Sequence, residues 1–524
     1  MPTPHEKLAE SLEVLKELQN ENGAAAIRTG DISRTHRERL VENGFLIEVL
    51  RGWYIPSRPN VAPGDSTSWY ASYWRFCAAY LNERFKRNWC LSPDQSLIIH
   101  SGNWTVPQQL LIRSPLGKNN TVNLPYNTSL YDLKGSLPGK QYVEEKEGLQ
   151  AYTVAASLIY CSPGLFTNNP TDIRTALMLI RDASDVLTIL LDNGHSAIAG
   201  RLAGAFRNVG RDRVANEILK AMESAGYNVR EADPFADRIN PGGTGRPESP
   251  YVVRVRMMWQ AMRGVVIARF PKPPGLPKNK VQLLKHIAEV YVTDAYHSLS
   301  IEGYRVTPEL IERVRSGSWN PDRDSKDTEQ RNALAARGYW LTYQAVLKSL
   351  EKILAGNNPG GVVEDDHSTW YRELFSPSVL VGLLKARDLA GYRNGPVYIR
   401  NSMHVPLNRD AVLDAMPEFF NLLKQEEHAA VRVMLGHFIF VYIHPYFDGN
   451  GRIGRFLMNS MLIAGGYPWT VVPVAKRKQY MEALEQASVY QNIEPFTNFL
   501  TTLVESGMKG EPLPAIPNRD LGGV

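Results

Sequence analysis

The chain is poor in cysteine and lacks long hydrophobic runs, and each shortage excludes a class of protein. Its 524 residues include three cysteines, Cys77, Cys90 and Cys161, too few and too scattered for a disulfide framework or a zinc site. The longest apolar stretch, MLGHFIFVYI (434–443), is far shorter than the ~20 residues of a membrane-spanning helix and contains His437. The start, MPTPHEKLAESLEV, lacks the apolar core of a signal peptide. We therefore expect a cytoplasmic protein with no membrane partner.

A strong excess of charge of one sign is also missing. The formal net charge is +5, from 59 basic and 54 acidic residues, which permits a polyanionic partner without requiring one. Hydrophobic residues make up 43% of the chain and charged residues 22%, which is typical of a globular protein. We find no internal repeat and no long low-complexity tract, so the length predicts two to four ordinary domains.

The first sixty residues predict a winged helix-turn-helix domain (1–60). LAESLEVLKELQNENG has apolar residues at helical spacing, SRTHRERLVENG reads as a second helix ending at Gly44, and FLIEVLRGWYIP gives two short β-rich runs. The second helix would direct Arg34, Arg37 and Arg39 towards double-stranded DNA. From Arg28 to Arg58, however, six arginines face four acidic residues. This weak excess leaves a protein-interaction module as the alternative to DNA binding.

The remaining chain divides at a segment rich in Pro, Gly and Ser, 236–250, which we interpret as a domain linker. Before it, 61–235 mixes strand-like and helical patterns in a domain of unknown role. Together with 1–60 it loosely resembles the AbiE-type antitoxins. After the linker, 251–508 is mostly helical by pattern and includes a long helix over 278–302. Residues 509–524 form a tail.

The densest chemistry lies in HPYFDGNGRIGR, residues 444–455. This stretch joins two predicted helices, so backbone N–H groups around Gly449, Asn450 and Gly451 lack partners within the new helix. Glycines let an anion approach that backbone, and the helix dipole favours negative charge there. Asp448 offers oxygen to a hard cation such as Mg²⁺, and His444 can accept a proton near neutral pH.

Two arginines complete this stretch. Arg452 and Arg455 are three residues apart, so they are neighbours on one face of the new helix. We interpret the group as a site for a nucleotide diphosphate or triphosphate with a nucleophile beside it. A calcium EF-hand fails because Ile453 and Asn459 stand where its glycine and glutamate belong. A P-loop fails because Arg455 replaces its lysine and a helix precedes the loop.

The same stretch is similar to the signature loop of the Fic-domain (filamentation induced by cAMP) family, His-Pro-Phe-x-Asp-Gly-Asn-Gly-Arg-x-x-Arg, and departs from it only at Tyr446, where we expect an inward-facing ring. Three further stretches fit the family pattern: HSLSIEG (297–303), a flap YIRNSMHVPL (398–407), and KRKQYMEAL (476–484). The resemblance covers about half of the chain. It implies a bacterial nucleotidyltransferase that moves AMP from ATP to a Ser, Thr or Tyr hydroxyl of a target protein or of itself (AMPylation).

The resemblance also implies roles for single residues. His444 would be the base, Asp448 would hold Mg²⁺ (Mn²⁺ is the alternative), and the backbone from Gly449 to Gly451 would bind phosphate oxygens together with Arg452 and Arg455. The flap would dock the target by strand pairing; its residues are Ile399, Arg400, Asn401, Ser402, Met403 and His404.

HSLSIEG is similar to the family's inhibitory motif, in which Ser298, Glu302 and Gly303 are the matching residues. Glu302 would pair with Arg455 and restrain the transferase from within the chain. Two alternatives stay open: removal of AMP by the same site, and a DNA-binding regulator or antitoxin whose Fic half mainly senses nucleotide. The expected fold is a mainly α catalytic half, with a Fic-like helical core and a small β-hairpin flap, preceded by a winged helix-turn-helix and a mixed α/β domain.

Overall fold

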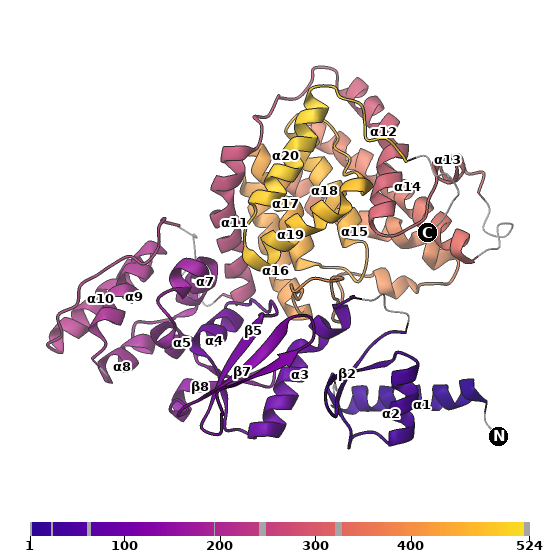
Figure 1. Ribbon diagram of the computed structural model, residues 1–524. Coiled ribbons are helices and arrows are strands. Elements are labelled where there is room, and N and C mark those ends of the chain that lie inside the picture. Colours follow the sequence, from indigo (N-terminus) through magenta and orange to yellow (C-terminus); the bar gives the residue numbers. More distant parts are fainter. Residues whose placement is uncertain are drawn as a thin grey trace. The chain divides into compact units, whose positions relative to one another are not determined.

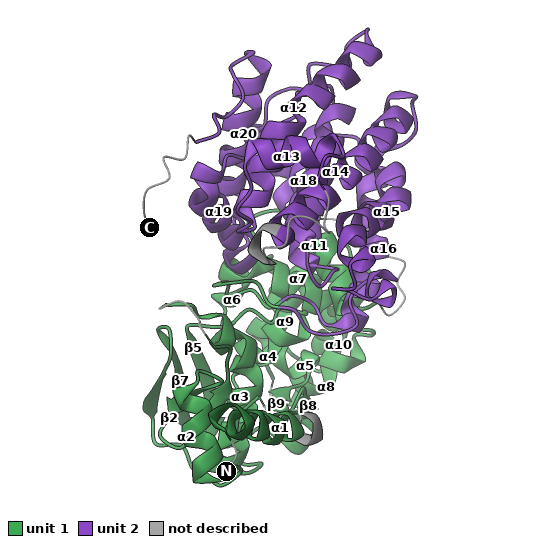
Figure 2. Ribbon diagram, turned by 90° about the vertical axis from the view of Figure 1, so that its right-hand side faces the viewer, with its two compact units in different colours: residues 1–257, 398–405 green, residues 258–397, 406–524 purple. Residues whose placement is uncertain are grey.

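The computed structural model describes residues 3–22, 25–59, 64–192, 194–239, 248–319 and 327–517. These residues form two compact units (Figure 2). Unit 1 consists of Met1–Met257 together with Tyr398–Val405, and unit 2 consists of Met258–Val397 and Pro406–Val524. Residues 240–247 of the predicted linker and 518–524 of the predicted tail lie outside the described residues.

Unit 1 begins with two helices and a small antiparallel sheet (Figure 1). Strand order in the sheet is β1-β3-β2, and Leu15, Ile27 and Leu40 are among the residues that form its small core. Ser33 caps α2 by accepting a hydrogen bond from the N–H of His36. The elements are α1 (Pro4–Asn22), β1 (Ile27–Arg28), α2 (Arg34–Glu42), β2 (Leu46–Leu50) and β3 (Trp53–Pro56). The sequence predicted both helices and both β-rich runs.

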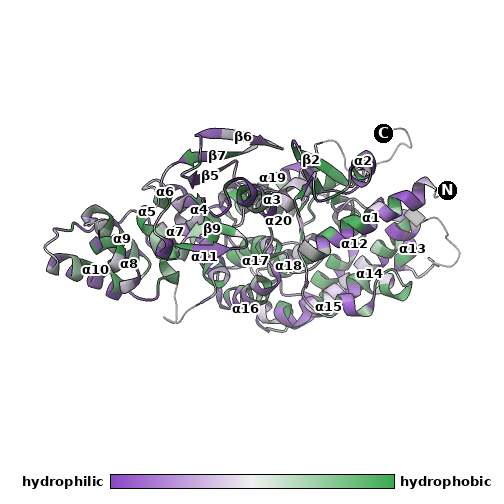
Figure 3. Cartoon of the chain, turned by 90° about the horizontal axis from the view of Figure 1, so that it is seen from below, coloured by the Kyte–Doolittle hydropathy of each residue, from purple (hydrophilic) through white to green (hydrophobic). Residues whose placement is uncertain are grey.

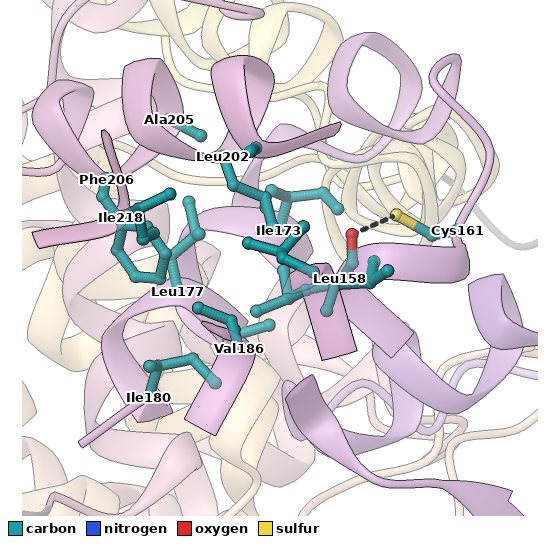
Figure 4. Packing of buried hydrophobic residues seen from close by; sticks show 14 of the residues in the cluster. Leu158, Cys161, Ile173, Leu177, Ile180, Val186, Leu202, Ala205, Phe206 and Ile218 are labelled. Carbon is teal, nitrogen blue, oxygen red and sulfur yellow. Dashed lines mark hydrogen bonds between the residues drawn. The ribbon is translucent and has the colours of Figure 1, made fainter. Parts of the chain in front are cut away.

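The rest of unit 1 combines a four-stranded mixed sheet, of order β4-β5-β7-β6, with a two-stranded sheet and several helices. A buried cluster between the helices is made almost wholly of aliphatic and phenylalanine side chains, and Cys161 lies in it with its thiol donating to the carbonyl of Leu158 (Figure 4). Hydrophobic and hydrophilic residues alternate along α10, which buries Val214, Ile218 and Met222 (Figure 3). The elements are α3 (Thr67–Phe85), β4 (Cys90–Leu91), α4 (Pro93–His100), β5 (Gln109–Ser114), β6 (Asn120–Leu124), β7 (Thr128–Lys134), η1 (Lys140–Tyr142), β8 (Val143–Lys146), β9 (Leu149–Tyr152), α5 (Val154–Tyr160), α6 (Leu165–Asn168), α7 (Pro170–Leu179), α8 (Ser184–Asp192), α9 (Ser196–Asn208) and α10 (Asp212–Ser224).

Unit 2 is helical, as the sequence predicted. Its central helices are α17, buried on nearly every side, and α18, which follows α17 after a short loop (Figure 1). The helix expected over 278–302 is α12, with Glu302 at its C-cap. The elements are α11 (Pro250–Arg269, shared with unit 1), α12 (Lys280–Ile301), α13 (Pro308–Arg315), α14 (Asp327–Leu354), α15 (Pro359–Leu380), η2 (Ala386–Leu389), α16 (Arg409–Gln425), α17 (Ala429–Ile443), α18 (Asn450–Ala464), η3 (Val474–Lys476), α19 (Arg477–Tyr490) and α20 (Glu494–Met508). None of the described helices is long and apolar enough to cross a membrane.

The predicted β-hairpin flap is wrong. Residues 396–407 contain no strand and form a turn in which the N–H of Ser402 donates to the carbonyl of Ile399. Pro396 and Pro406 remove two N–H donors from the alternating pattern, and Asn401 adopts the left-handed region at φ 57°. The alternation of apolar and polar side chains was therefore not a sign of strand pairing.

Candidate active site

The loop between α17 and α18 fixes His444 in an unusual backbone conformation. His444 ends α17 in the left-handed region, at φ 56° and ψ 60°. Its Nδ1 lies 3.1 Å from the carbonyl oxygen of Val441. A carbonyl can only accept, so Nδ1 carries the proton and Nε2 keeps its lone pair. Burial of the ring lowers the pKa of His444 to about 4, helped by the positive charge of Arg393 and opposed by the bond to Val441. His444 is therefore neutral near pH 7, the form that a base requires.

The start of helix α18 contains backbone N–H groups without partners in the preceding turn, and two glycines with distinct tasks. Gly449 is the N-cap at φ 81°, where a Cβ would also lie only 2.9 Å from Leu374 Cδ2. A Cβ on Gly451 would collide with Oε1 of Glu302, which shows how closely that carboxylate approaches this backbone. The side-chain oxygen of Asn450 accepts from the N–H of Tyr446 (2.9 Å) and its amide donates to the Tyr446 carbonyl (2.8 Å). Asn450 thus offers an anion its backbone, while its side chain holds the loop.

Tyr446, the departure from the family signature, points inward as expected. It is 1% exposed, and its ring stacks on that of Tyr371 with centroids 3.8 Å apart and an angle of 9°. Its hydroxyl has no hydrogen-bond partner among the described residues.

Asp448 and Arg452 lie side by side with opposite exposure. The side chain of Asp448 is 62% exposed and that of Arg452 only 1%, with Arg452 Nη2 3.2 Å from Asp448 Oδ1. The guanidinium is held between the rings of Tyr304 and Phe375, each centroid 5.2 Å away. Its Nε has no hydrogen-bond partner in the described chain, and the side chain borders a cavity of about 250 Å³. A buried cation with unused donors at a cavity wall is suited to binding an anion.

The inhibitory residues predicted from HSLSIEG meet Arg455. Its Nη2 donates to Oε1 of Glu302 at 2.7 Å and to the carbonyl of Ser298 at 3.1 Å, and its Nε donates to Oγ of Ser298 at 2.9 Å. Burial alone would lower the pKa of Arg455, but the charge and hydrogen bond of Glu302, together with Tyr480 and Tyr339, raise it on balance. Gly303 follows in the left-handed region at φ 87° and ends α12.

The donors at this site fit a magnesium ion that takes only one ligand from the protein. Among the described residues there is no group of three or more His, Cys, Asp or Glu side chains able to hold a metal. Mg²⁺ commonly binds one carboxylate and completes its shell with phosphate and water. The exposed carboxylate of Asp448, beside the start of α18, would be that single ligand.

The predicted docking residues do not lie in unit 2. Segment 398–405 packs in unit 1, where Arg400 Nε lies 3.1 Å from Asp65 Oδ2 and Asn401 Oδ1 accepts from the N–H of Ser66 at 3.1 Å. The carbonyl oxygen of Met403 accepts a hydrogen bond from the N–H of Val106 (3.0 Å). Ile399 belongs to the turn, and Ser402 and His404 are buried. The structure therefore does not bring these residues together with His444 inside one unit.

The three arginines predicted to contact DNA differ in their surroundings. Arg34 is exposed and pairs with Glu38 on the same helix at 2.6 Å. Arg37 lies over the ring of Tyr54 at 5.7 Å. Arg39 donates to the carbonyl of Lys7 and the hydroxyl of Ser11, both at 2.7 Å, so it ties α2 to α1. DNA binding stays a prediction, and Arg34 and Arg37 are the residues that can test it.

Sequence reasoning missed the residues that support the site from other elements. Tyr304 and Phe375 enclose Arg452, and Arg393 donates to the carbonyl of His444. Tyr304 directly follows the inhibitory motif, a position that could have drawn attention to it. The stretch around Arg393, GYRNGP, reads as an ordinary turn and gives no such signal.

The site places a histidine beside a helix start of the kind that is suited to binding an anion, within a helical unit. Residues 364–462 match the model of the Fic/DOC family. The chain is 25% identical over 256 residues to the protein adenylyltransferase Fic of Nematostella vectensis, covering 48% of this chain and 56% of that protein. It is 27% identical over 223 residues to the protein adenylyltransferase Fic of Drosophila grimshawi, covering 41% of this chain and 42% of that protein. The chain thus spans about half the length of the curated relatives it matches.

Two solved structures are also similar to the chain. Fic-1 of C. elegans (134–508) aligns with a TM-score of 0.37 and 17% identity, over 62% of this chain and 92% of that one. A Fic domain containing signaling protein from Bacteroides thetaiotaomicron aligns with a TM-score of 0.34 and 18% identity, over 49% and 100%.

Proposed function

We propose that the protein transfers AMP from ATP to a Ser, Thr or Tyr hydroxyl of a target protein, and that Glu302 restrains this transfer. The observation that carries the proposal is the position of the Glu302 carboxylate. It bonds Arg455 and lies against Gly451 at the start of α18, the place where a phosphate would gain most from backbone donors and helix dipole. The names of the relatives, protein adenylyltransferase Fic, support the same reaction.

In the proposed reaction Nε2 of His444 takes the proton from the target hydroxyl as its oxygen attacks the α-phosphorus of ATP. A new O–P bond forms, the bond from the α-phosphorus to the bridging oxygen breaks, and pyrophosphate leaves. The N–H groups at the start of α18 stabilise the charge that develops on phosphate oxygens, and Arg452 supports the leaving group. Mg²⁺ bound at Asp448 would supply further charge neutralisation.

Restraint follows from competition for the same groups. While Glu302 holds Arg455, that guanidinium is not available to the γ-phosphate, and the carboxylate places negative charge where the phosphates must lie. ATP can still bind, but with its α-phosphorus displaced from the line of attack. A displacement of about an ångström costs on the order of 10²-fold in rate.

The test uses the full chain with α-labelled ATP, Mg²⁺ and a cell lysate. We expect Glu302→Gly to raise labelling of itself or of target proteins about 10²-fold, and Glu302→Gln to raise it less because the amide keeps the bulk without the charge. Glu289→Gln is the matched control, since Glu289 lies on the same helix with its side chain 63% exposed. His444→Ala in the Glu302→Gly background should abolish labelling, because no base remains.

Each failure points to a different conclusion. Equal labelling by wild type and Glu302→Gly would exclude restraint by Glu302. No labelling by any variant would exclude the transfer itself. A third outcome is that the wild type removes AMP from a labelled protein and Glu302→Gly does not. In that case the site catalyses removal, and Glu302 takes part in the chemistry.

A further inference from the structure

Arg393 is a buried cation that joins the active-site loop to the two ends of segment 396–406. It is 2% exposed. Its Nε donates to the carbonyl oxygen of His444 at 2.7 Å, its Nη1 donates to the carbonyl of Gly395 at 3.0 Å, and its Nη2 donates to the carbonyl of Leu407. Its backbone N–H donates to the carbonyl of Pro445 at 2.9 Å. One side chain thus contacts three separate stretches of backbone.

The three acceptors have distinct positions. Gly395 comes just before segment 396–406 and Leu407 just after it, so a single guanidinium closes this loop at its base. The third acceptor belongs to His444, the residue whose left-handed backbone ends α17. Carbonyls at a helix C-terminus lack partners within the helix, and a cation there is favourable. The planar fork of arginine is suited to bridging several acceptors in a fixed geometry.

We propose that Arg393 is a positioning residue, which holds the backbone of the base His444 at a fixed spacing from Gly395 and Leu407 within unit 2. The inference rests on the proposed transfer reaction. Each of these contacts is made to backbone, so Arg393 acts through His444 and through the loop ends at Gly395 and Leu407. The position of the base within unit 2 then depends on this one side chain.

The positive charge of Arg393 has a second effect in the same direction. Burial is the main cause that lowers the pKa of His444, and Arg393 adds to it. The residue that orients the loop thus also favours the neutral imidazole.

The test compares Arg393→Met and Arg393→Lys, both in the Glu302→Gly background. Arg387→Met is the matched control, since the side chain of Arg387 is 79% exposed and lies 3.9 Å from Asp388. We expect Arg393→Met to lower the single-turnover rate of transfer about 10²-fold while the Kd for ATP changes less than about threefold. Arg393→Lys should fall between, because an ammonium keeps the charge but cannot bridge three carbonyls. The control should leave both quantities unchanged.

A second measurement does not depend on transfer. In hydrogen–deuterium exchange, Arg393→Met should speed exchange over 397–407 and 444–446 and leave α12 and the body of α18 unchanged. If Arg393→Met does not fold, Arg393→Lys decides the question by the same two measurements.

Several results would overturn the proposal. The first is a transfer rate and an exchange rate that both stay unchanged in Arg393→Met, or in Arg393→Lys if Arg393→Met does not fold. The second is a loss of ATP affinity as large as the loss of transfer rate. Failure of the Glu302→Gly parent to transfer AMP would instead reject the proposed function. The exchange measurement would still decide whether Arg393 holds the loop and His444 together.

Discussion

At the scale of single residues, the pH at which His444 becomes protonated determines when the site has a free base. Its Nδ1 is fixed by Val441, and burial lowers its pKa to about 4. A folded-state pKa below that of an exposed histidine means that the neutral, reactive form persists to lower pH.

We therefore expect the single-turnover rate of Glu302→Gly to stay nearly constant from pH 7.5 to 5.5 and to fall only as the pH approaches about 4. An unperturbed histidine would lose roughly tenfold over the same interval, because its pKa is about 6.5. The measurement is a pH–rate profile with ATP at saturation. A decline centred near pH 6.5 would contradict the assignment.

Tyr446 gives a prediction on stability. Its hydroxyl is buried without a partner in the described chain, and its ring stacks on Tyr371. Tyr446→Phe keeps the stacking and removes the unpaired group, so we expect the free energy of unfolding to rise by about 1 kcal/mol. Tyr392→Phe is the control: its hydroxyl donates to His367 Nε2 at 2.9 Å, and its loss should cost about 1 kcal/mol. Denaturant unfolding measures both, and a loss of stability in Tyr446→Phe would refute the expectation.

Residues with a local signal could be predicted, and residues without one could not. Ser298, Glu302 and Arg455 belong to two short motifs, and the structure joins them by hydrogen bonds of 2.7–3.1 Å. Arg393 acts on carbonyl oxygens, which every residue carries, from stretches up to 51 positions away. No side-chain pattern marks such a partner, so only the folded chain identifies it.

At the scale of elements, helices were easier to predict than the flap. Glu302 and Gly303 ended α12 as expected because a glycine in the left-handed region is a local property of the chain. The flap failed because pairing of strands depends on a partner. Its alternation of apolar side chains instead reflects Met403 and Val405, which pack against a buried cluster of unit 1 that contains Trp69, Trp74 and Phe76.

Helix α2 is the element that decides whether the N-terminal domain binds DNA. Arg34 pairs with Glu38 and Arg37 lies over the ring of Tyr54, whereas Arg39 donates a hydrogen bond to the backbone of α1. If the domain binds a duplex, Arg34→Ala with Arg37→Ala should weaken binding and reduce its salt dependence by about one to two charges. Fluorescence anisotropy of a labelled duplex with the full chain, over a range of salt, measures this. Absence of wild-type binding even at low salt would make the domain a protein-interaction module.

At the scale of the whole molecule, residues Tyr398–Val405 belong to unit 1, although the chain on both sides of them belongs to unit 2. Met403 and Val405 contact the core that contains Trp69, Trp74 and Phe76. Met403→Ala should lower the free energy of unfolding of unit 1 on the order of 1–2 kcal/mol, since the side chain is half-buried. Tryptophan fluorescence during denaturant unfolding reports it, with the half-exposed Leu413→Ala as control. An unchanged transition midpoint would mean that the segment adds nothing to this core.

The excursion of 398–405 also has a consequence for synthesis on the ribosome. Unit 1 is translated through Met257 first, yet one piece of it is made some 140 residues later, a delay of roughly 7–30 s at about 5–20 residues per second. During that interval the apolar surface that receives Met403 and Val405 is uncovered beside the growing chain. We therefore expect nascent unit 1 to bind chaperones until segment 398–405, which is made later in the chain, arrives to complete it.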